Sequence, residues 1–309
     1  MRSVCTETEA NRDRSKQRVR GSIAGCSSAG KGEKTDMKSL RELMKMIELP
    51  REAAEILYDL ENRLPLESVA EDIRNLTEYP VWRQTWQKLK SWAAPDERGF
   101  RMLLLMLHAA AWSYDKYEAC GISEKIFADT MKCFPRFMEE YREAYGVYGF
   151  DRDFWVGRQL SLQLFRLGEL EFEKTMDGSQ RTIEVHIPSD AVLTEENCRS
   201  SLKMAVRFFQ KYDEAYTDAP YACESWLLSP VLKELLPETS RIIRFQNLFT
   251  IQSTDADSRE FMWWIFRKRE AKTEDLPQNT SLQRNVRQHL LKGGKIGSGQ
   301  GCVKPEYLR

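Results

Sequence analysis

The chain has no excess of either charge, no paired cysteine motif and no long apolar run. Its 47 Lys and Arg balance its 47 Asp and Glu, so it lacks the positive field with which dedicated nucleic-acid binders contact phosphates. Its 7 cysteines include no CxxC pair, which argues against a zinc ribbon and a disulfide framework. We therefore expect a cytoplasmic protein with reduced thiols, with no bound metal and no nucleic-acid partner.

The most apolar segment, MLLLMLHAAAW at 102–112, is too short to span a bilayer and has charged residues on both sides. It is typical of a buried helix, so no membrane partner is expected. Hydrophobic residues make up 41% of the chain and aromatic residues 11%, which is enough apolar mass for folded cores. At 309 residues, two domains are the natural expectation.

The first half of the chain is predicted to be a short leader followed by helices. Residues 1–36 contain few large apolar residues and many Ser, Gly, Arg and Lys, which predicts a disordered leader. Residues 37–146 carry apolar side chains at helical spacing, so we expect a helical N-terminal domain there. Its last helix, at 123–145, is expected to begin at Ser123 and to be kinked or split by Pro135.

Strand patterns replace helical ones in residues 147–301. The stretch LFRLGELEFEK alternates, which predicts one strand with Glu169, Glu171 and Glu173 on one face. An Asp-Gly turn and a returning strand at 181–189 complete a hairpin. A helix capped by Thr194, a strand at 221–228 and a helix from Ser229 are expected to follow.

The remaining elements complete an α+β fold. We expect a second hairpin at 248–268, a helix at 280–292 and a glycine-rich end, GGKIGSGQG, that acts as a helix cap and leads into a flexible tail at 302–309. This order describes a mixed sheet with helices on both faces.

Several segments resemble known sequences. FRLGELEFE, VHIPS, SWLLSPVLKELLP, RFQNLF and TSLQRNVRQHLLKGGKIGSG resemble the C-terminal half of bacterial acyltransferases in which a helical domain precedes a GNAT-like domain. The resemblance implies transfer of an acyl group from acetyl-CoA or another acyl-CoA to an amine of a small molecule or peptide. In GNAT-like domains two central strands splay apart, pantetheine lies in the gap, and the pyrophosphate meets the amides at the next helix N-terminus.

The splayed strands would be those at 181–189 and 221–228, because Pro188 cannot donate a ladder hydrogen bond. Glu224 would then face the gap and act as the general base. His186 is the alternative base, or a ligand for a substrate carboxylate. Tyr221 could protonate the leaving thiolate. The plainer interpretations are a solvated Glu224, a solvated His186 and a packed Tyr221.

The phosphate-binding turn departs from the GNAT-like pattern. The corresponding segment SDAVLTEENCRSS has no glycine, and Glu195 and Glu196 in the first helical turn would repel a phosphate. Ile187 and Ser189 are still expected to contact the acyl donor beside the gap. The positive end of the final helix could replace the missing turn through Thr280, Arg284 and Arg287.

Two functions therefore stay open at this point. The first is an acyl-CoA-dependent N-acyltransferase that transfers the acyl group directly. Direct transfer is favoured over a Cys223–His186 nucleophile pair, because a buried cysteine is common as a small apolar residue. The second is a non-catalytic ligand-binding or adaptor protein that retains a GNAT-like sheet.

Overall fold

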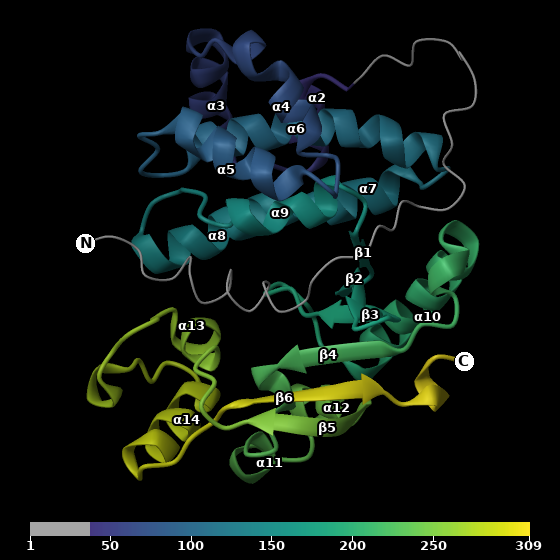
Figure 1. Ribbon diagram of the computed structural model, residues 1–309. Helices are drawn as coiled ribbons and strands as arrows, with labels where there is room; N and C mark the ends of the chain where they lie inside the picture. Colours follow the sequence, from purple (N-terminus) through teal and green to yellow (C-terminus); the bar gives the residue numbers. More distant parts are fainter. Residues whose placement is uncertain (1–37) are drawn as a thin grey trace.

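The computed structural model describes residues 38–309, as a helical region above a mixed β-sheet (Figure 1). The leader predicted at 1–36 lies outside the described residues. The helical region contains α2 (Leu40–Met46), α3 (Arg51–Arg63), α4 (Ala70–Asn75), α5 (Trp82–Ala93), α6 (Phe100–Ala119), α7 (Glu124–Met131), α8 (Cys133–Tyr145) and α9 (Asp153–Leu160). Within the described part of the chain, no helix is long and apolar enough to cross a membrane.

The helical region is arranged around α6. This helix is buried over most of its length and packs against α2, α3, α4, α5, α7 and α9. The apolar segment at 102–112 is therefore a core helix, as predicted. The hydroxyl of Ser123 accepts a hydrogen bond from the amide of Ile126 and caps α7. The helix expected at 123–145 is split into α7 and α8 just before Pro135, which confirms the effect expected of that proline.

The second region is a six-stranded sheet in the order β1-β2-β3-β4-β6-β5. Its strands are β1 (Leu164–Leu167), β2 (Leu170–Asp177), β3 (Gln180–His186), β4 (Tyr221–Ser225), β5 (Phe249–Asp255) and β6 (Ser298–Val303). Its helices are α10 (Glu195–Tyr212), α11 (Leu232–Leu235), α12 (Arg241–Gln246), α13 (Phe261–Phe266) and α14 (Ser281–Leu291). Only β3 and β4 pair in parallel; the other neighbours are antiparallel.

Helices cover both faces of this sheet, which confirms the predicted fold class. Helix α10 begins at Thr194, whose hydroxyl accepts from the amide of Asn197, and it packs on β1 and β2. Helices α8 and α9 are the part of the helical region that lies nearest the opposite face (Figure 1). That face carries Glu171 and Glu173, which are only 2% and 8% exposed. The row of acids is therefore covered, and it is not the solvated side of the sheet.

Three predicted strands need correction. The stretch LFRLGELEFEK is a hairpin, not one strand, because Gly168 adopts a φ of +72° and allows a tight turn between β1 and β2. The second hairpin predicted at 248–268 is wrong, since only β5 is a strand and 261–266 form α13. Strand β4 ends at Ser225, whose hydroxyl accepts from the amide of Leu227 and begins a 3-10 turn.

The predicted glycine cap of the last helix is confirmed, because Gly293 adopts a φ of +82° and the amides of Gly293 and Gly294 donate to the carbonyls of Leu290 and His289. The flexible tail predicted to follow it is wrong. Residues 298–303 form β6, which lies between β4 and β5. A Cβ at Gly299 would lie 2.4 Å from the carbonyl oxygen of Leu228, and one at Gly301 would lie 2.7 Å from that of Thr250. Close backbone approach therefore requires glycine in this strand. Because glycine has a low strand propensity, the segment could not be predicted as a strand from its sequence.

Candidate active site

The central strands β3 and β4 pair at only two positions and then separate. Ile183 pairs with Tyr221 and Glu184 pairs with Ala222, and no further pair joins these two strands. Pro188 follows β3 directly after the gap opens, as expected from its missing amide. A cavity of about 780 Å³ lies at this gap, bounded by the sheet and by residues of α8 and α9.

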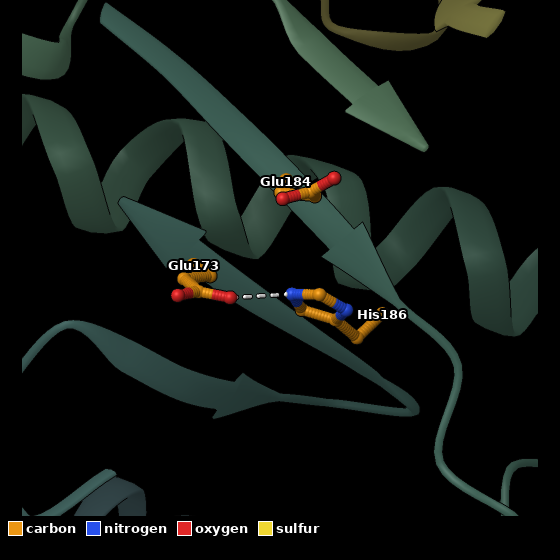
Figure 2. Close-up of side chains that lie close together, drawn as sticks. All are labelled: Glu173, Glu184 and His186. Carbon is orange, nitrogen blue, oxygen red and sulfur yellow. Dashed lines mark hydrogen bonds and ion pairs between the residues drawn. The ribbon is translucent and has the colours of Figure 1, made fainter. Parts of the chain in front are cut away.

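His186, at the end of β3, lines this cavity and is held by a chain of ion pairs. Its Nε2 lies 2.8 Å from Oε2 of Glu173 on β2 (Figure 2). Oε1 of Glu173 in turn lies 3.0 Å from Nε of Arg158 on α9. The ring of Trp155 meets the imidazole edge to face at 5.2 Å. The position of the imidazole is therefore fixed from two sides.

The same ion pairs set the protonation of this pair. Burial alone would lower the pKa of His186, but the hydrogen bond to Glu173 and the surrounding carboxylates outweigh it and raise the pKa above its ordinary value of 6.5. Burial would raise the pKa of Glu173, but Arg158 and His186 lower it to about 2. Glu173 is thus an ionised carboxylate that makes His186 more basic.

Glu184 lies beside this pair on β3 (Figure 2). One ligand atom each of Glu173, Glu184 and His186 lies within 4.8 Å of the others. Two carboxylates and an imidazole are ligands that several divalent cations accept. However, Arg158 already forms an ion pair with Glu173, so a cation bound here would compete with this guanidinium for the carboxylate.

The structure brings four of the predicted site residues together around the cavity. Glu224 on β4, His186 on β3, and Ile187 and Ser189 just after β3 all line it. Glu224 is exposed and lines the cavity, so its carboxylate lies at the cavity opening, where it lacks the burial that would raise the basicity of a general base.

The other four predicted site residues lie elsewhere. Tyr221 is 3% exposed, does not line the cavity and packs with its ring 6.1 Å from Phe172. Burial raises its pKa well above the usual range, so the structure does not support it as a proton donor. Its neighbour Cys223 is also buried in the core. Thr280 caps α14, while Arg284 and Arg287 donate to backbone carbonyls near that helix and also lie outside the cavity lining.

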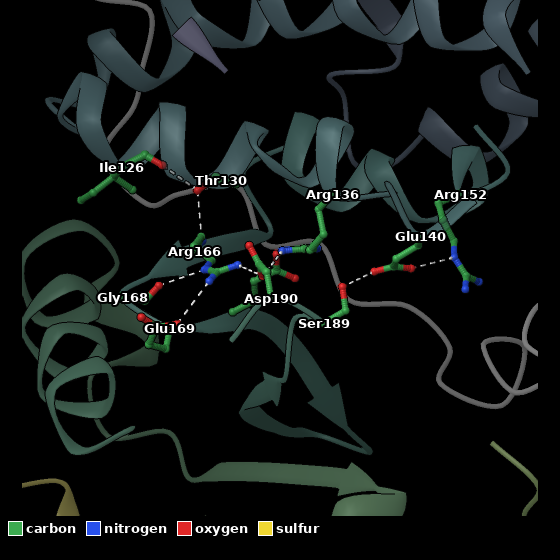
Figure 3. A network of polar contacts seen from close by, with 11 residues as sticks. Ile126, Thr130, Arg136, Glu140, Arg152, Arg166, Gly168, Glu169, Ser189 and Asp190 are labelled. Carbon is green, nitrogen blue, oxygen red and sulfur yellow. Dashed lines mark hydrogen bonds and ion pairs between the residues drawn. The ribbon is translucent and has the colours of Figure 1, made fainter. Parts of the chain in front are cut away.

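A polar network joins the two regions at the edge of the site (Figure 3). Arg136 of α8 lies 2.7 Å from Glu171 of β2, and both side chains are almost fully buried. Ser189 donates a 2.6 Å hydrogen bond to Glu140 of α8. Since these contacts fix α8 against β2 and the loop after β3, the cavity belongs to both regions.

Sequence reasoning missed the residues of the helical region that complete the site. Arg136, Glu140, Arg152 and Arg158 line the cavity, yet each lies in a helical segment or turn with no recognisable motif. The alternating acids of β2 were the available signal. These acids lie at an interface, where buried arginines of the helical region pair with them. Which arginines do so can be told only from the packing of the two regions.

The family comparison agrees with this two-part site. Residues 38–162 match the N-acyltransferase N-terminal domain, and residues 164–303 match the GNAT-like C-terminal domain. The chain therefore carries an N-acyltransferase N-terminal domain followed by a GNAT-like C-terminal domain. The matched ranges meet between α9 and β1, and together they include all the residues that line the cavity except Gln163.

Solved acyltransferase structures share the fold. One, in complex with decanoyl-CoA and teicoplanin, is 22% identical, has a TM-score of 0.73 and aligns over 88% of this chain and 91% of its own. Another, a variant in complex with octanoyl-CoA, is 23% identical, has a TM-score of 0.73 and aligns over 86% and 87%. Among curated proteins, no sequence matches this chain.

Proposed function

We propose that this protein transfers an acyl group from acyl-CoA to a primary amine by direct attack in a ternary complex. One observation carries this proposal: the cavity opens where β3 and β4 part, with an oriented histidine on one strand and a carboxylate on the other. Pantetheine can pair with strand edges only where two strands leave each other. The acyltransferases of the same fold that bind acyl-CoA support this choice of donor.

His186 is proposed to accept the proton of the attacking amine. The amine nitrogen attacks the thioester carbonyl, a C–N bond forms, the C–S bond breaks, and the N–H proton passes to the imidazole. An oriented base of this kind contributes roughly 10²- to 10⁴-fold to the rate. The free thiolate of CoA then takes up a proton, so the products are an amide and CoA.

Glu224 is proposed to bind the incoming amine. It lies across the gap from His186 and is exposed at the cavity opening, where a carboxylate attracts an ammonium group. The bound ammonium loses one proton to solvent before its nitrogen attacks, and the second proton is the one that passes to His186. This assignment moves the role of general base from Glu224 to His186, since the carboxylate of Glu173 holds the imidazole of His186 in place at the cavity.

The lining of the cavity also supports a donor longer than acetyl-CoA. Apolar side chains surround the gap, namely Phe137, Trp155, Ile187, Trp226, Leu227 and Ile242. Burial of each methylene group contributes about 0.8 kcal/mol, so affinity is expected to rise with acyl length. Acyltransferases of this fold have been solved with octanoyl- and decanoyl-CoA, which supports a medium-length acyl chain.

The test is calorimetric binding of acetyl-, octanoyl- and decanoyl-CoA, followed by release of free CoA thiol in the presence of an amine panel. The panel holds amino sugars, amino acids, lysine peptides and a glycopeptide of the teicoplanin type. We expect binding that tightens with acyl length and thiol release with at least one amine. Absence of binding to all three donors would contradict the proposed function.

A cytoplasmic location is part of the same proposal. The five described cysteines, Cys120, Cys133, Cys198, Cys223 and Cys302, are all free thiols. This is consistent with a reducing compartment, in which acyl-CoA would also be available.

A further inference from the structure

The turn between β3 and α10 already holds anions of the protein itself. The amide of Val192 donates a 2.8 Å hydrogen bond to Oε2 of Glu169. Asp190 lies 2.7 Å from Arg166 and 3.7 Å from Arg136 (Figure 3). Glu195 and Glu196 then occupy the first turn of α10. The Val192 amide and the two arginines beside this turn are thus already paired with carboxylates of the protein, so a diphosphate would have to displace them to bind here.

Two arginines meet at a different wall of the cavity. Arg152, just before α9, lies with its guanidinium 5.2 Å from the ring of Trp263 and 6.0 Å from that of Trp264. Arg267, at the end of α13, lies 5.9 Å from the ring of Trp264. Arg152, Trp264 and Arg267 all line the cavity. Two guanidinium groups from different domains therefore share one indole at the cavity wall.

Arg267 is held in place on the protein side. It ends α13 in the left-handed region, with a φ of +53°, a conformation that costs a non-glycine residue free energy and concentrates at functional sites. Its Nε lies 2.9 Å from the half-exposed carboxylate of Glu143 on α8. Its Nη1 is buried and has no hydrogen-bond partner among the described residues. One edge of the guanidinium is thus anchored, while a buried donor on it lacks a hydrogen-bond partner among the described residues.

The surroundings of Arg152 place this pair next to the end of β3. Nε of Arg152 lies 3.9 Å from Oε2 of Glu140, whose other oxygen accepts the hydroxyl of Ser189 (Figure 3). Ser189 follows β3 by three residues, so the arginines lie where a ligand leaving the strand gap would emerge. Among the acids that line the cavity, Glu260 is nearest to Arg267 in sequence. It precedes α13, whereas Arg267 follows it, so roughly 10 Å of helix separates the two residues.

We propose that Arg152 and Arg267, stacked on Trp264, bind an oxyanion group of a substrate. The group is the diphosphate of the acyl donor or a carboxylate of the acceptor. Both are planar or tetrahedral oxyanions that guanidinium groups bind through paired hydrogen bonds. The inference rests on the proposed function and adds to it the place where the charged end of a substrate is held. Because carboxylates of the protein already occupy the turn before α10, the diphosphate needs another site, and this favours the diphosphate over an acceptor carboxylate.

The experiment compares wild-type protein with Arg267→Gln and Arg152→Gln, and uses Arg269→Gln as the matched control. Arg269 lies 4.8 Å from Trp263 but does not line the cavity. The probes are CoA, pantetheine, inorganic pyrophosphate, glycylglycine and glycylglycinamide, titrated by calorimetry. Because Arg152 is almost fully buried and its variant can fail to fold, the variant of Arg267, whose side chain is 24% exposed, decides the outcome.

If the bound group is the diphosphate of the acyl donor, Arg267→Gln should weaken binding of CoA and pyrophosphate by about 10-fold or more, while pantetheine binding stays unchanged. If the bound group is a carboxylate of the acceptor, the variant should weaken binding of glycylglycine and leave binding of glycylglycinamide and CoA unchanged. Either result supports the oxyanion site, provided that Arg269→Gln behaves like the wild type.

Equal binding of CoA, pyrophosphate and glycylglycine by wild type and Arg267→Gln would overturn the inference. If acyl-CoA still binds in that case, the proposed function stands and only the oxyanion site fails. If wild-type protein binds pyrophosphate but no acyl-CoA, and Arg267→Gln loses pyrophosphate, the site stands and the proposed function fails. Wild-type protein that binds neither these probes nor any acyl-CoA would contradict both.

Discussion

His186 and Glu224 would face each other across β3 and β4 if the two strands stayed paired. The register joins Glu184 to Ala222, so the next pair on the same face would be His186 and Glu224. Pairing ends before that point, and both residues line the cavity that opens there. A histidine with a buried carboxylate behind it and an exposed carboxylate thus lie on opposite walls of one gap.

Replacement of His186 tests its role as the base. We expect His186→Gln to lower kcat by roughly 10²- to 10⁴-fold with the best donor and amine, because the amide cannot accept the proton. The measurement is thiol release under saturating substrates, with circular dichroism to confirm folding. His289→Gln is the control, since His289 lies on α14 outside the cavity lining. A kcat within about 3-fold of wild type would contradict the assignment.

Replacement of Glu173 tests the pH dependence of the base. His186 acts as a base only when neutral, so kcat/KM should fall as the pH drops through its folded-state pKa, which lies above 6.5. Glu173→Gln removes the nearest negative charge, so the pKa of His186 should fall and the acidic limb should move to lower pH. The pH–rate profiles of wild type and variant provide the measurement.

The direction of the shift decides this second test. A purely structural role for Glu173 would lower the rate without moving the acidic limb. An acidic limb that stays in place, or moves to higher pH, would contradict the coupling of Glu173 to His186. Glu169→Gln, which changes an acid outside the cavity lining, is the control.

The sequence predicted the elements whose patterns are local. The caps at Ser123 and Thr194, the break before Pro135 and the hairpin between β2 and β3 each depend on neighbouring residues. Strand β6 could not be predicted, because Gly299 and Gly301 are selected by close backbone approach to other segments and not by strand propensity. The second predicted hairpin failed for a related reason, since the aromatic row at 261–266 packs equally well on a short buried helix.

The candidate site was predictable only on the sheet side. His186, Ser189 and Glu224 follow from strand alternation and from Pro188, so they could be placed at a gap. Glu173 was visible as an alternating acid, but its burial depends on Arg158, which arrives from the other domain. Contacts between domains produce no periodic pattern in the sequence, so Arg136, Arg152 and Arg158 could not be predicted as site residues.

The buried ion pair between Arg136 and Glu171 should stabilise the contact between the domains. Arg136→Met leaves the carboxylate of Glu171 buried without its 2.7 Å partner, which is expected to lower the free energy of unfolding by about 3–5 kcal/mol. Urea denaturation of the single variant measures this loss. The double variant Arg136→Met, Glu171→Met should recover most of it, because an apolar pair of similar volume replaces both charges. A double variant no more stable than the single one would show that the loss comes from packing.

Replacement of Glu224 separates amine binding from proton transfer. Glu224→Gln keeps the size of the side chain and removes the charge that faces the cavity opening. If this charge attracts the acceptor as an ammonium ion, the variant should raise KM for the amine by roughly 10-fold, about 1.4 kcal/mol, with kcat within a few-fold of wild type. The KM for acyl-CoA should stay unchanged, and Tyr221→Phe should behave like the wild type because Tyr221 lies outside the cavity lining. A large fall in kcat at unchanged KM would instead make Glu224 the base and His186 its accessory, since a group that acts only in the transition state lowers kcat without weakening substrate binding.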